Sequence, residues 1–283
     1  MVSVNFHLTD FCNLRCKFCY AHFYNTQEKN KLQRDQILEI LKKLQSEGFI
    51  KINFAGGEPF LHPLLGDLIH YAYKVGLKTS VVTNGTLVTK EWLDKYGHYL
   101  HWIGISCDSA DEKIEKNLGR GSGTHVASTI HAFEMIKAFN TNNSKHRIRM
   151  KLNSVITSLN CQEDMKNFVI QCGVERWKIF QFLHIHGEND SVCDELAITN
   201  EQFSNFILKH KNLEKQNIGL VPENNDAMIE SYIMMDSEGR FYQNKENFYK
   251  KSDPVLVAGI SRALQQVGFS QEKFLSRGGL YSF

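Results

Sequence analysis

The sequence predicts an α/β fold in which parallel strands form a barrel or a partial barrel. Three observations support this prediction. Strand-like and helix-like segments alternate through roughly six units between residues 2 and 183. Such alternation requires a parallel sheet with right-handed crossovers, and no second pattern divides the region. The alternation weakens after about residue 185, so we expect a barrel over residues 1–185 and an extension over residues 186–283 packed on it.

The expected elements follow one another in regular order. Strands are expected at residues 2–8, 49–57, 77–85, 102–109, 147–156 and 175–183. Helices with apolar residues at helical spacing are expected at 34–48, 64–76, 89–100, 124–139 and 161–173. In the extension, residues 199–216 should form a helix capped by Thr199 or Asn200. Residues 232–244 should form a hairpin that turns near Glu238 and Gly239, and short helical pieces should follow Pro254.

Composition excludes several classes of protein. The chain has 283 residues, of which 42% are apolar, enough to bury a sizeable core. Its formal net charge of +2 gives no overall basic field for binding a nucleic-acid polymer. The first residues are too polar for a signal peptide, and no apolar run is long enough to span a membrane. We therefore expect a cytoplasmic protein that binds neither a membrane nor a nucleic-acid polymer.

The cysteines fall into two groups. Seven cysteines without a signal peptide indicate a reducing compartment, where metal or redox chemistry is more common than a disulfide framework. The scattered ones are expected to be small buried hydrophobic residues, and they are Cys107, Cys161, Cys172 and Cys193. The other three stand together in "CNLRCKFCY".

The grouped residues Cys12, Cys16 and Cys19 follow the first expected strand with the spacing C-x3-C-x2-C. This places them at the carboxyl end of the sheet, where barrels of this kind have their active sites. A structural zinc site takes four ligands, usually as two separated pairs, and the chain has no second pair. A 4Fe–4S cluster normally takes four thiolates, so three leave one iron open to another molecule. His22 is an alternative fourth ligand, although a lone histidine near a loop is more often a surface residue.

Further polar residues and glycines follow the next expected strands at the same end of the sheet. They are Gly56, Gly57, Glu58 and Pro59 in "NFAGGEP", Asn84, Ser106, Asp108, and Arg120 in "GRGSG". The glycines allow a backbone to approach a ligand closely, the glutamate adds a carboxylate, and the proline fixes the turn. The arginine suits a ligand carboxylate. An ordinary strand-to-helix turn and a solvated loop arginine are the alternatives.

The strands themselves carry an unexpected set of polar residues. Strands of a parallel sheet covered on both faces should be apolar throughout, because side chains alternate between two buried faces. Here one face carries Asn5, His7, Lys51, Asn53, Arg149, Lys151, Asn153, Arg176 and Lys178, while the opposite face is apolar. The apolar face must meet the helices, so the polar face points into the barrel. Converging cations without acids on the same strands would repel one another, which predicts a polyanionic ligand such as a di- or triphosphate.

Together, the C-x3-C-x2-C and GGEP motifs resemble those of the radical S-adenosylmethionine (radical SAM) superfamily. The resemblance implies a partial (β/α)6 barrel with a 4Fe–4S cluster on the three cysteines, whose open iron is chelated by S-adenosylmethionine. It also implies that Phe18 lies near the adenine and that the GGEP turn holds the methionine amino group. The residues expected to complete the cofactor site are Asn84, Ser106, Asp108, Arg120 and Asn153.

Longer matches in the same order cover nearly the whole chain and resemble the viperin family of radical SAM antiviral nucleotide-modifying enzymes. They include "VNFHLTDFCNLRCKFCY", "KINFAGGEPFL", "SCDSADE", "GRGSG", "KLNSVI", "RWKIFQ", "GEN", "VPEN", "SY" and "RGGLY". The resemblance implies that a 5′-deoxyadenosyl radical removes the ribose 4′ hydrogen of CTP, UTP or GTP. The 3′ hydroxyl then leaves as water, and the product is a chain-terminating 3′-deoxy-3′,4′-didehydro nucleotide.

The resemblance also assigns residues and partners. The positions expected to contact the nucleotide are Asn5, Lys51, Lys151, Arg176 and Lys178. Tyr232 falls beside the ribose as a candidate catalytic proton donor, whereas the sequence alone favours a packed hairpin aromatic. The family implies an external one-electron reductant of flavodoxin or ferredoxin type. The chain begins at its first strand, without the amphipathic helix of animal viperins, so a cytosolic prokaryotic-type member or a trimmed chain is expected. Shifted lysines between Phe241 and Pro254 leave the base preference open.

Two other functions stand as alternatives. A radical SAM peptide-modifying maturase often carries extra cysteine clusters in its C-terminal extension, whereas here only Cys193 lies beyond Cys172. A non-catalytic iron–sulfur sensor or structural module would need neither the GGEP turn nor a phosphate pocket. Nucleotide-dependent release of 5′-deoxyadenosine after anaerobic reconstitution distinguishes the three functions.

Overall fold

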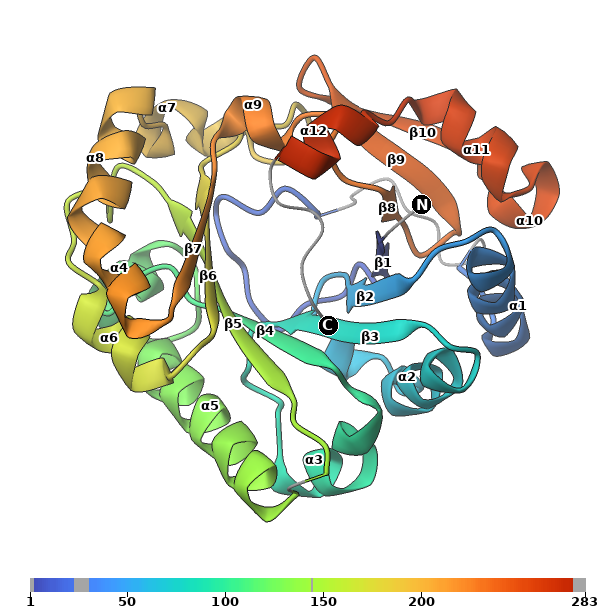
Figure 1. Ribbon diagram of the computed structural model, residues 1–283. Coiled ribbons are helices and arrows are strands. Elements are labelled where there is room, and N and C mark those ends of the chain that lie inside the picture. The colour runs from blue at the N-terminus through green and yellow to red at the C-terminus, as the bar shows by residue number, and fades with distance from the viewer. Residues whose placement is uncertain (1–2, 23–30, 144, 277–283) are drawn as a thin grey trace.

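The computed structural model describes residues 3–22, 31–143 and 145–276, and its strands form a ten-stranded sheet. The strand order is β10-β9-β8-β1-β2-β3-β4-β5-β6-β7, so the first six strands follow the chain in sequence order. They are β1 (Ser3–His7), β2 (Lys51–Ala55), β3 (Lys78–Thr83), β4 (Trp102–Ser106), β5 (Arg149–Ile156) and β6 (Arg176–Gln181). Neighbours among them pair in parallel, as predicted. The sheet curves around the centre of the molecule (Figure 1).

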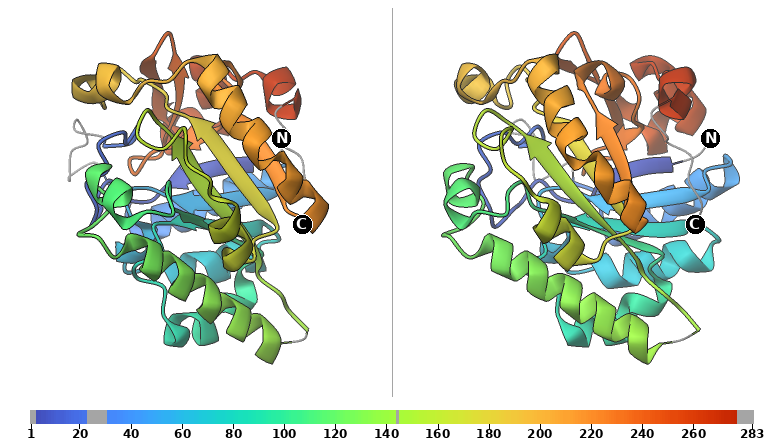
Figure 2. Two further views of the ribbon diagram at one scale, coloured as in Figure 1. Left: turned by 90° about the vertical axis from the view of Figure 1, so that its left-hand side faces the viewer. Right: turned by 60° about the vertical axis from the view of Figure 1, so that its left-hand side comes forward.

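Helices cover the outside of this curved sheet (Figures 1 and 2). They are α1 (Arg34–Ser46), α2 (Leu65–Lys74), α3 (Lys90–Tyr96), α4 (Glu112–Asn117), α5 (His125–Asn142) and α6 (Lys166–Cys172). In α1 the buried residues Ile37, Ile40, Leu41 and Leu44 recur at helical spacing, which explains why the sequence pattern identified it. The prediction missed α4, whose six residues are too few to show a period, and it began α6 several residues too early.

The apolar faces of the strands meet the helices, as the alternation predicted. The outward residues Val4, Phe6, Ile52, Phe54, Met150, Leu152, Trp177 and Ile179 are each at most 3% exposed. Full burial of a large apolar side chain contributes about 1.5–3 kcal/mol. The core therefore lies between sheet and helices, and the opposite strand face is left for polar side chains.

The chain after β6 extends the sheet at both of its edges. β7 (Gly219–Glu223) pairs in parallel with β6, while β8 (Met234–Met235) pairs in parallel with β1. β9 (Arg240–Lys245) and β10 (Phe248–Pro254) continue antiparallel from β8. The predicted hairpin is therefore confirmed as β8 and β9, with Gly239 at a φ of 72° in its turn. The extension thus contacts the barrel through the sheet itself, and the prediction missed β7.

Short helices complete the extension. They are α7 (Cys193–Leu196), α8 (Asn200–His210), α9 (Asn225–Met228), α10 (Val255–Ala258), α11 (Ile260–Val267) and α12 (Gln271–Ser276). Thr199 caps α8, because its hydroxyl accepts from Gln202 N at 3.1 Å while Gln202 Oε1 accepts from Thr199 N at 2.8 Å. None of the helices described here is long and apolar enough to cross a membrane. The "RGGLY" match, residues 277–281, lies outside the described residues.

Candidate active site

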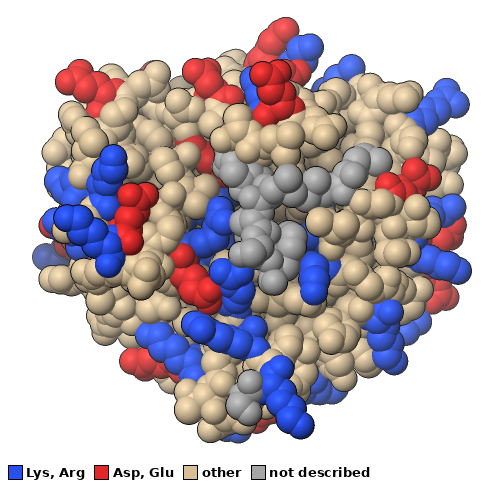
Figure 3. Space-filling view, in the orientation of Figure 1, with Lys and Arg blue, Asp and Glu red and all other residues tan. Residues whose placement is uncertain are grey.

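A cavity of about 820 Å³ runs through the interior of the barrel. The predicted site residues in its wall are Asn5, Cys12, Cys16, Phe18, Cys19, Lys51, Gly56, Gly57, Asn84, Ser106, Arg120, Lys151, Asn153, Arg176, Lys178 and Tyr232. The structure therefore brings together the cofactor and nucleotide residues that the sequence predicted separately. Three predicted residues, Glu58, Pro59 and Asp108, do not line the cavity. Figure 3 shows Lys and Arg side chains gathered near the centre of the viewed face.

The cysteine loop, residues 8–22, is held from one side by the turn after α4. Arg15 N donates to Gly119 O at 3.2 Å, and Lys17 N donates to Leu118 O at 2.9 Å. A Cβ atom at Gly119 would lie 2.1 Å from Arg15 O, and Gly119 has a φ of +86°. Only glycine allows this conformation and this approach. The turn that carries Arg120 is thereby fixed against the loop that carries the cysteines.

The double glycine after β2 holds the cysteine loop from the other side. A Cβ at Gly56 would lie 2.4 Å from Thr9 O, and a Cβ at Gly57 would lie 2.2 Å from Phe11 O. Gly57 N also donates to Thr9 O at 2.6 Å. From the sequence, these glycines were expected to allow close approach of a ligand. The structure shows a close approach of the cysteine-loop backbone.

Burial raises the pKa of all three loop cysteines, to about 12 for Cys16 and about 11 for Cys19. Buried thiols of this kind become thiolates when a metal cation takes them as ligands. Three sulfur donors on one wall fit three corners of a 4Fe–4S cluster, and the adjoining cavity has room for a ligand at the fourth. In the part of the chain that the structure describes, no further cysteine lines this cavity.

His22, the alternative fourth ligand, lines the cavity but contacts Glu188. Its backbone N donates to Glu188 Oε2 at 2.7 Å, and its Nδ1 lies 3.1 Å from Glu188 O. Glu188 belongs to the "GEN" segment that follows β6. These contacts give the imidazole a role in joining two loops.

Glu58 organises the turn after β3. Its carboxylate accepts hydrogen bonds from Thr83 Oγ1 at 2.6 Å, Asn84 N at 2.8 Å and Phe60 N at 3.0 Å. Burial raises the pKa of this carboxyl group. Asn84 Nδ2 donates in turn to Asn13 Oδ1 of the cysteine loop at 2.8 Å. The carboxylate expected to face a ligand instead fixes the backbone and side chain of Asn84.

Arg120 lines the cavity with buried carboxylates behind it. Its Nε donates to Asp108 Oδ2 and lies 3.8 Å from Glu115 Oε2. Burial acts to lower its pKa, but the charges of Asp108, Cys16 and Glu115, together with the hydrogen bond to Asp108, outweigh this effect and raise it. The guanidinium carbon is 5.3 Å from the ring centroid of Phe18, at cation–π distance. Asp108 therefore acts on the cavity through the position of Arg120.

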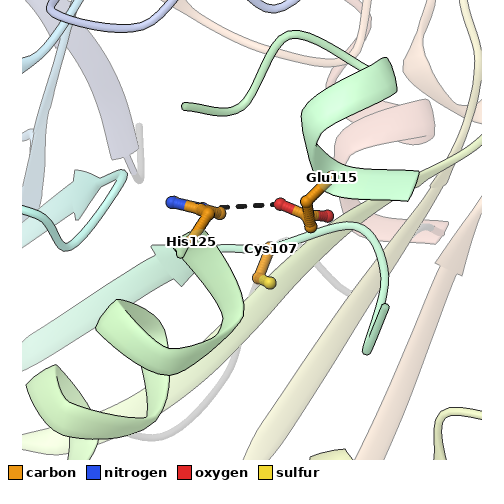
Figure 4. Close-up of side chains that lie close together, drawn as sticks. All are labelled: Cys107, Glu115 and His125. Atoms are coloured by element: carbon orange, nitrogen blue, oxygen red, sulfur yellow. Dashed lines mark ion pairs between the residues drawn. The ribbon is translucent and has the colours of Figure 1, made fainter. Parts of the chain in front are cut away.

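Cys107, Glu115 and His125 lie close together, and Figure 4 shows His125 facing the Glu115 carboxylate across an ion pair. All three are at most 2% exposed, and His125 Nε2 lies 3.6 Å from Glu115 Oε2. Glu115 Oε1 accepts the backbone N–H groups of Asp108 and Ser109 at 2.8 and 2.7 Å. Burial, together with the charge of Asp108, raises the pKa of Glu115 to about 8. The Glu115 carboxyl group lies beside the Arg120 guanidinium and accepts the backbone N–H of Asp108, so it helps to fix the positions of both residues.

The inward strand faces bring the predicted cations together. Lys151 on β5 is the register partner of Arg176 on β6, and Lys51 and Lys178 line the same cavity. Burial, together with the charges of Lys178 and Arg176, lowers the pKa of Lys151 to about 7. Burial and the same neighbours hold the pKa of Lys51 well below its usual value. The prediction of mutually repelling inward cations is thus supported by the geometry.

A glycine that the sequence analysis did not single out makes room for Lys151. Gly104 on β4 is the register partner of Lys151, and a Cβ at Gly104 would lie 2.6 Å from Lys151 Cε. Glycine inside a strand signals this kind of close approach. The lysine side chain therefore crosses β4 where that strand has no side chain.

The sequence predicted no acids on the strands that carry these cations, but acids from outside those strands reach two of the cations. Arg149 lies outside the cavity wall, where its Nε donates to Glu175 Oε2 at 2.8 Å and its guanidinium packs over Trp102. Lys178 Nζ lies 2.7 Å from Glu223 Oε1. The lone cysteines also differ, because Cys193 is only partly buried, whereas the other three are buried as predicted.

Lys178, Glu223 and Tyr232 form a closed hydrogen-bonded triad. Lys178 Nζ donates to Tyr232 OH at 2.7 Å, and Tyr232 OH donates to Glu223 Oε2. Glu223 is fully buried at the end of β7. Glu223 was not predicted as a site residue, because β7 contains Pro222 and was not expected as a strand, although Glu223 lies within the "VPEN" match.

The chain is similar to proteins of one superfamily. Residues 6–150 match the family described as the Radical SAM superfamily. An S-adenosylmethionine-dependent nucleotide dehydratase from Flammeovirga pacifica is 37% identical over 99% of this chain and 96% of its own length. One from Lacinutrix mariniflava is 38% identical over 99% of this chain and 58% of its own length. The dehydratase RSAD2 from Danio rerio is 35% identical over 99% of this chain and 77% of its own length.

Solved structures have the same fold. Native anSMEcpe with bound AdoMet and a Kp18Cys peptide has a TM-score of 0.70 and 15% identity, covering 98% of this chain and 82% of that one. Streptococcus suis SuiB bound to S-adenosylmethionine has a TM-score of 0.69 and 16% identity, covering 99% of this chain and 68% of that one. At these identities the likeness shows the fold alone, and it confirms the predicted fold class. The family match and the near full-length relatives show that this chain belongs to the radical SAM superfamily and, within it, to the S-adenosylmethionine-dependent nucleotide dehydratases, the viperins.

Proposed function

We propose that the protein is a radical SAM enzyme that converts a nucleoside triphosphate (CTP, UTP or GTP) into its 3′-deoxy-3′,4′-didehydro analogue. One observation carries this proposal. Three cysteines and four buried or partly buried cations, Lys51, Lys151, Arg176 and Lys178, line the same cavity. A radical source and a polyanion site therefore adjoin. The product lacks the 3′ hydroxyl that a polymerase extends, which suits a role in antiviral defence.

The cysteine side of the cavity would hold the cofactors. Cys12, Cys16 and Cys19 would hold the 4Fe–4S cluster, and S-adenosylmethionine would lie against Phe18, Gly56, Gly57, Asn84, Ser106, Arg120 and Asn153. When bound, these cofactors supply a 5′-deoxyadenosyl radical. Glu58, Pro59 and Asp108 would support the site from behind, by fixing Asn84 and Arg120.

The strand side of the cavity would hold the triphosphate. Phosphate oxygens would neutralise the cations that now repel one another, and the Arg176 guanidinium offers a fork of donors. Asn5, whose Oδ1 accepts from Asn53 Nδ2 at 3.0 Å, would add an amide contact. Glu223 would keep Lys178 oriented while leaving it able to donate.

Tyr232 would supply the proton that completes the reaction. After loss of the 4′ hydrogen, the nucleotide radical needs one proton, with which the 3′ hydroxyl leaves as water, and one electron, which completes the double bond between C3′ and C4′. A proton donor must lie within hydrogen-bond reach of the accepting atom. The Tyr232 hydroxyl lies in the cavity wall, and the adjacent Lys178 ammonium would stabilise the phenolate that remains. The electron would come from an external reductant of flavodoxin or ferredoxin type, in the cytoplasm.

The peptide-modifying alternative is not favoured. The relatives that span nearly the whole chain at 32–38% identity are named nucleotide dehydratases. The neighbours with bound peptides share the fold at 15–16% identity and no more.

The test is anaerobic reconstitution followed by assay of each nucleoside triphosphate in turn. We expect 5′-deoxyadenosine and a didehydro nucleotide in equal amounts with the preferred triphosphate, and almost none of either without it. Deuterium at the ribose 4′ position should appear in the 5′-deoxyadenosine. Release of 5′-deoxyadenosine that does not depend on any nucleotide would contradict the proposal.

A further inference from the structure

Two histidines and an aspartate meet outside the barrel cavity, on the loop that follows β6. His184 Nε2 lies 2.6 Å from Asp190 Oδ1, and His186 Nδ1 lies 3.4 Å from the same oxygen. One ligand atom from each residue lies within 4.8 Å of the other two. We propose that these three side chains form a binding site for a divalent transition-metal ion, specifically Zn²⁺. This inference is independent of the proposed function, because none of the three is a predicted cofactor or nucleotide contact.

The residue types and their separations suit zinc. Imidazole nitrogen and carboxylate oxygen are both zinc ligands, and tetrahedral bonds of about 2.0–2.2 Å place ligand atoms about 3.3 Å apart. The observed separations of 2.6 and 3.4 Å bracket that value. The three side chains are between 21% and 55% exposed, so an ion can enter and water can complete its coordination.

The aspartate is held in the orientation that such a site requires. Asp190 Oδ2 accepts a hydrogen bond from Gly187 N at 2.9 Å, which turns Oδ1 toward the imidazoles. The His184 and His186 rings lie 4.4 Å apart between centroids, so both can direct a nitrogen toward one point. Second contacts that orient a ligand in this way are typical of metal sites.

The position of the site indicates what the ion would do. His186 N donates to Asn247 O in the β9–β10 turn at 2.8 Å, and its ring stacks on Phe248 at 4.5 Å between centroids. On the same loop, Asn189 Nδ2 donates to Phe18 O in the cysteine loop at 3.2 Å. An ion bound to His184, His186 and Asp190 would therefore hold in place the loop after β6, which contacts the cysteine loop on one side and the β9–β10 turn on the other.

A hydrogen bond between His184 and Asp190 could exist without any metal, so the test depends on His186. Holoenzyme reconstituted with its cluster is titrated anaerobically with Zn²⁺ in a calorimeter. We expect one high-affinity zinc ion per chain. His184→Ala, His186→Ala and Asp190→Asn should each weaken binding by at least about tenfold, the loss that follows removal of a ligand or its support.

Matched controls separate this site from other zinc ligands. His131→Ala removes an exposed lone histidine on α5, and Cys193→Ala removes the nearby thiol; both should bind zinc as the wild type does. The cluster absorbance is recorded before and after titration, so that zinc replacing cluster iron is recognised. Each variant must also retain the wild-type circular dichroism.

Hydrogen exchange provides a second readout. Zinc should slow exchange of the backbone amides at residues 184–190 and 246–248 in the wild type and leave them unchanged in His186→Ala. The proposal is overturned if zinc binds equally to the wild type and to folded His186→Ala, or if the wild type binds no zinc at this stoichiometry.

Discussion

The two sides of the cavity hold their charges in opposite ways. On the cysteine side, Arg120 is paired with Asp108 and lies beside Glu115, so the charge is compensated within the protein. On the strand side, the charges acting on Lys151 are mainly those of other cations, and its pKa falls to about 7 after burial. The positive charge on the cysteine side is thus neutralised by carboxylates of the protein, whereas the strand side should be stabilised when an anion binds. The arginine is held by carboxylates of the protein itself, whereas the lysines are suited to bind an anionic ligand.

The triad of Lys178, Glu223 and Tyr232 lies between these extremes. Glu223 compensates Lys178 and accepts from Tyr232, so this corner is pre-arranged without a ligand. The charges of Lys51 on β2 and Lys151 on β5 are compensated by acids to a smaller degree. Substitutions on each side should therefore have distinct consequences, and they can be ordered by expected size.

The largest effect should come from the cysteine side. Cys16→Ala removes one of three sulfur donors, so the cluster should not assemble and all S-adenosylmethionine cleavage should be lost. Iron content and anaerobic absorbance measure the first effect, and 5′-deoxyadenosine release measures the second. Cys193→Ala is the control, since this residue does not line the cavity and should leave both unchanged. Full iron loading in Cys16→Ala would disprove the assignment.

A smaller effect is expected from the strand side. Lys151→Ala and Lys178→Ala should each weaken triphosphate binding by about 1.5–3 kcal/mol, or about 10- to 150-fold, through loss of a charged hydrogen bond. Calorimetry with the preferred triphosphate measures this loss. Lys151→Ala is the cleaner variant, because Lys178→Ala also leaves the buried Glu223 carboxylate without its cation.

The same two variants test whether the sides of the cavity are independent. S-adenosylmethionine binding should change little in either one. Lys145→Ala, which removes an exposed lysine, is the matched control and should bind both ligands normally. Equal loss of both ligands in Lys151→Ala would mean that the division of the cavity is wrong.

At the triad, Tyr232→Phe should uncouple the reaction without stopping it. The ring stays while the hydroxyl that would donate the last proton is removed. 5′-Deoxyadenosine should still form with nucleotide present, whereas the didehydro product should fall severalfold below it. Chromatographic quantification of both products gives the ratio. Loss of both together would make Tyr232 a binding residue, and an unchanged ratio would exclude it as the proton donor.

The smallest effect should be a proton taken up on binding. The pKa of Lys151 is about 7 in the folded protein, against about 10.5 for an ordinary lysine. Because the folded value is lowered, the unfolded chain binds the extra proton, and stability of the ligand-free protein should rise from pH 7 toward 10.5. A bound triphosphate restores the charge, so Lys151 should take up about one proton per nucleotide bound at pH 8.

Calorimetry in buffers of different ionisation enthalpy measures this uptake. Lys151→Met keeps much of the side-chain volume and removes the titrating group, so uptake should decrease. Lys51, whose pKa is also lowered by burial, should account for the remainder. An uptake identical in wild type and Lys151→Met would show that Lys151 is charged before the nucleotide arrives.

Much of the fold could be predicted because its signals are local. The six parallel strands, the cap at Thr199 and the β8–β9 hairpin each depend on residues within a few positions of one another. α4 was missed because its six residues are too few to show a period, and β7 was missed because it contains Pro222. The polar strand faces, apart from Arg149, were predicted because alternation in a strand has a fixed period of two.

The sequence by itself determined the family, the first six strands, the three clustered cysteines and the inward face that carries Lys51, Lys151 and Lys178. The tertiary structure alone decided which remote groups meet: Glu223 with Lys178, Gly104 beneath the Lys151 side chain, and the double glycine against the cysteine loop. The physical reason is that periodicity and spacing are properties of neighbouring residues. Pairing across a sheet depends on register between strands that are distant in the chain, and only the folded molecule sets that register.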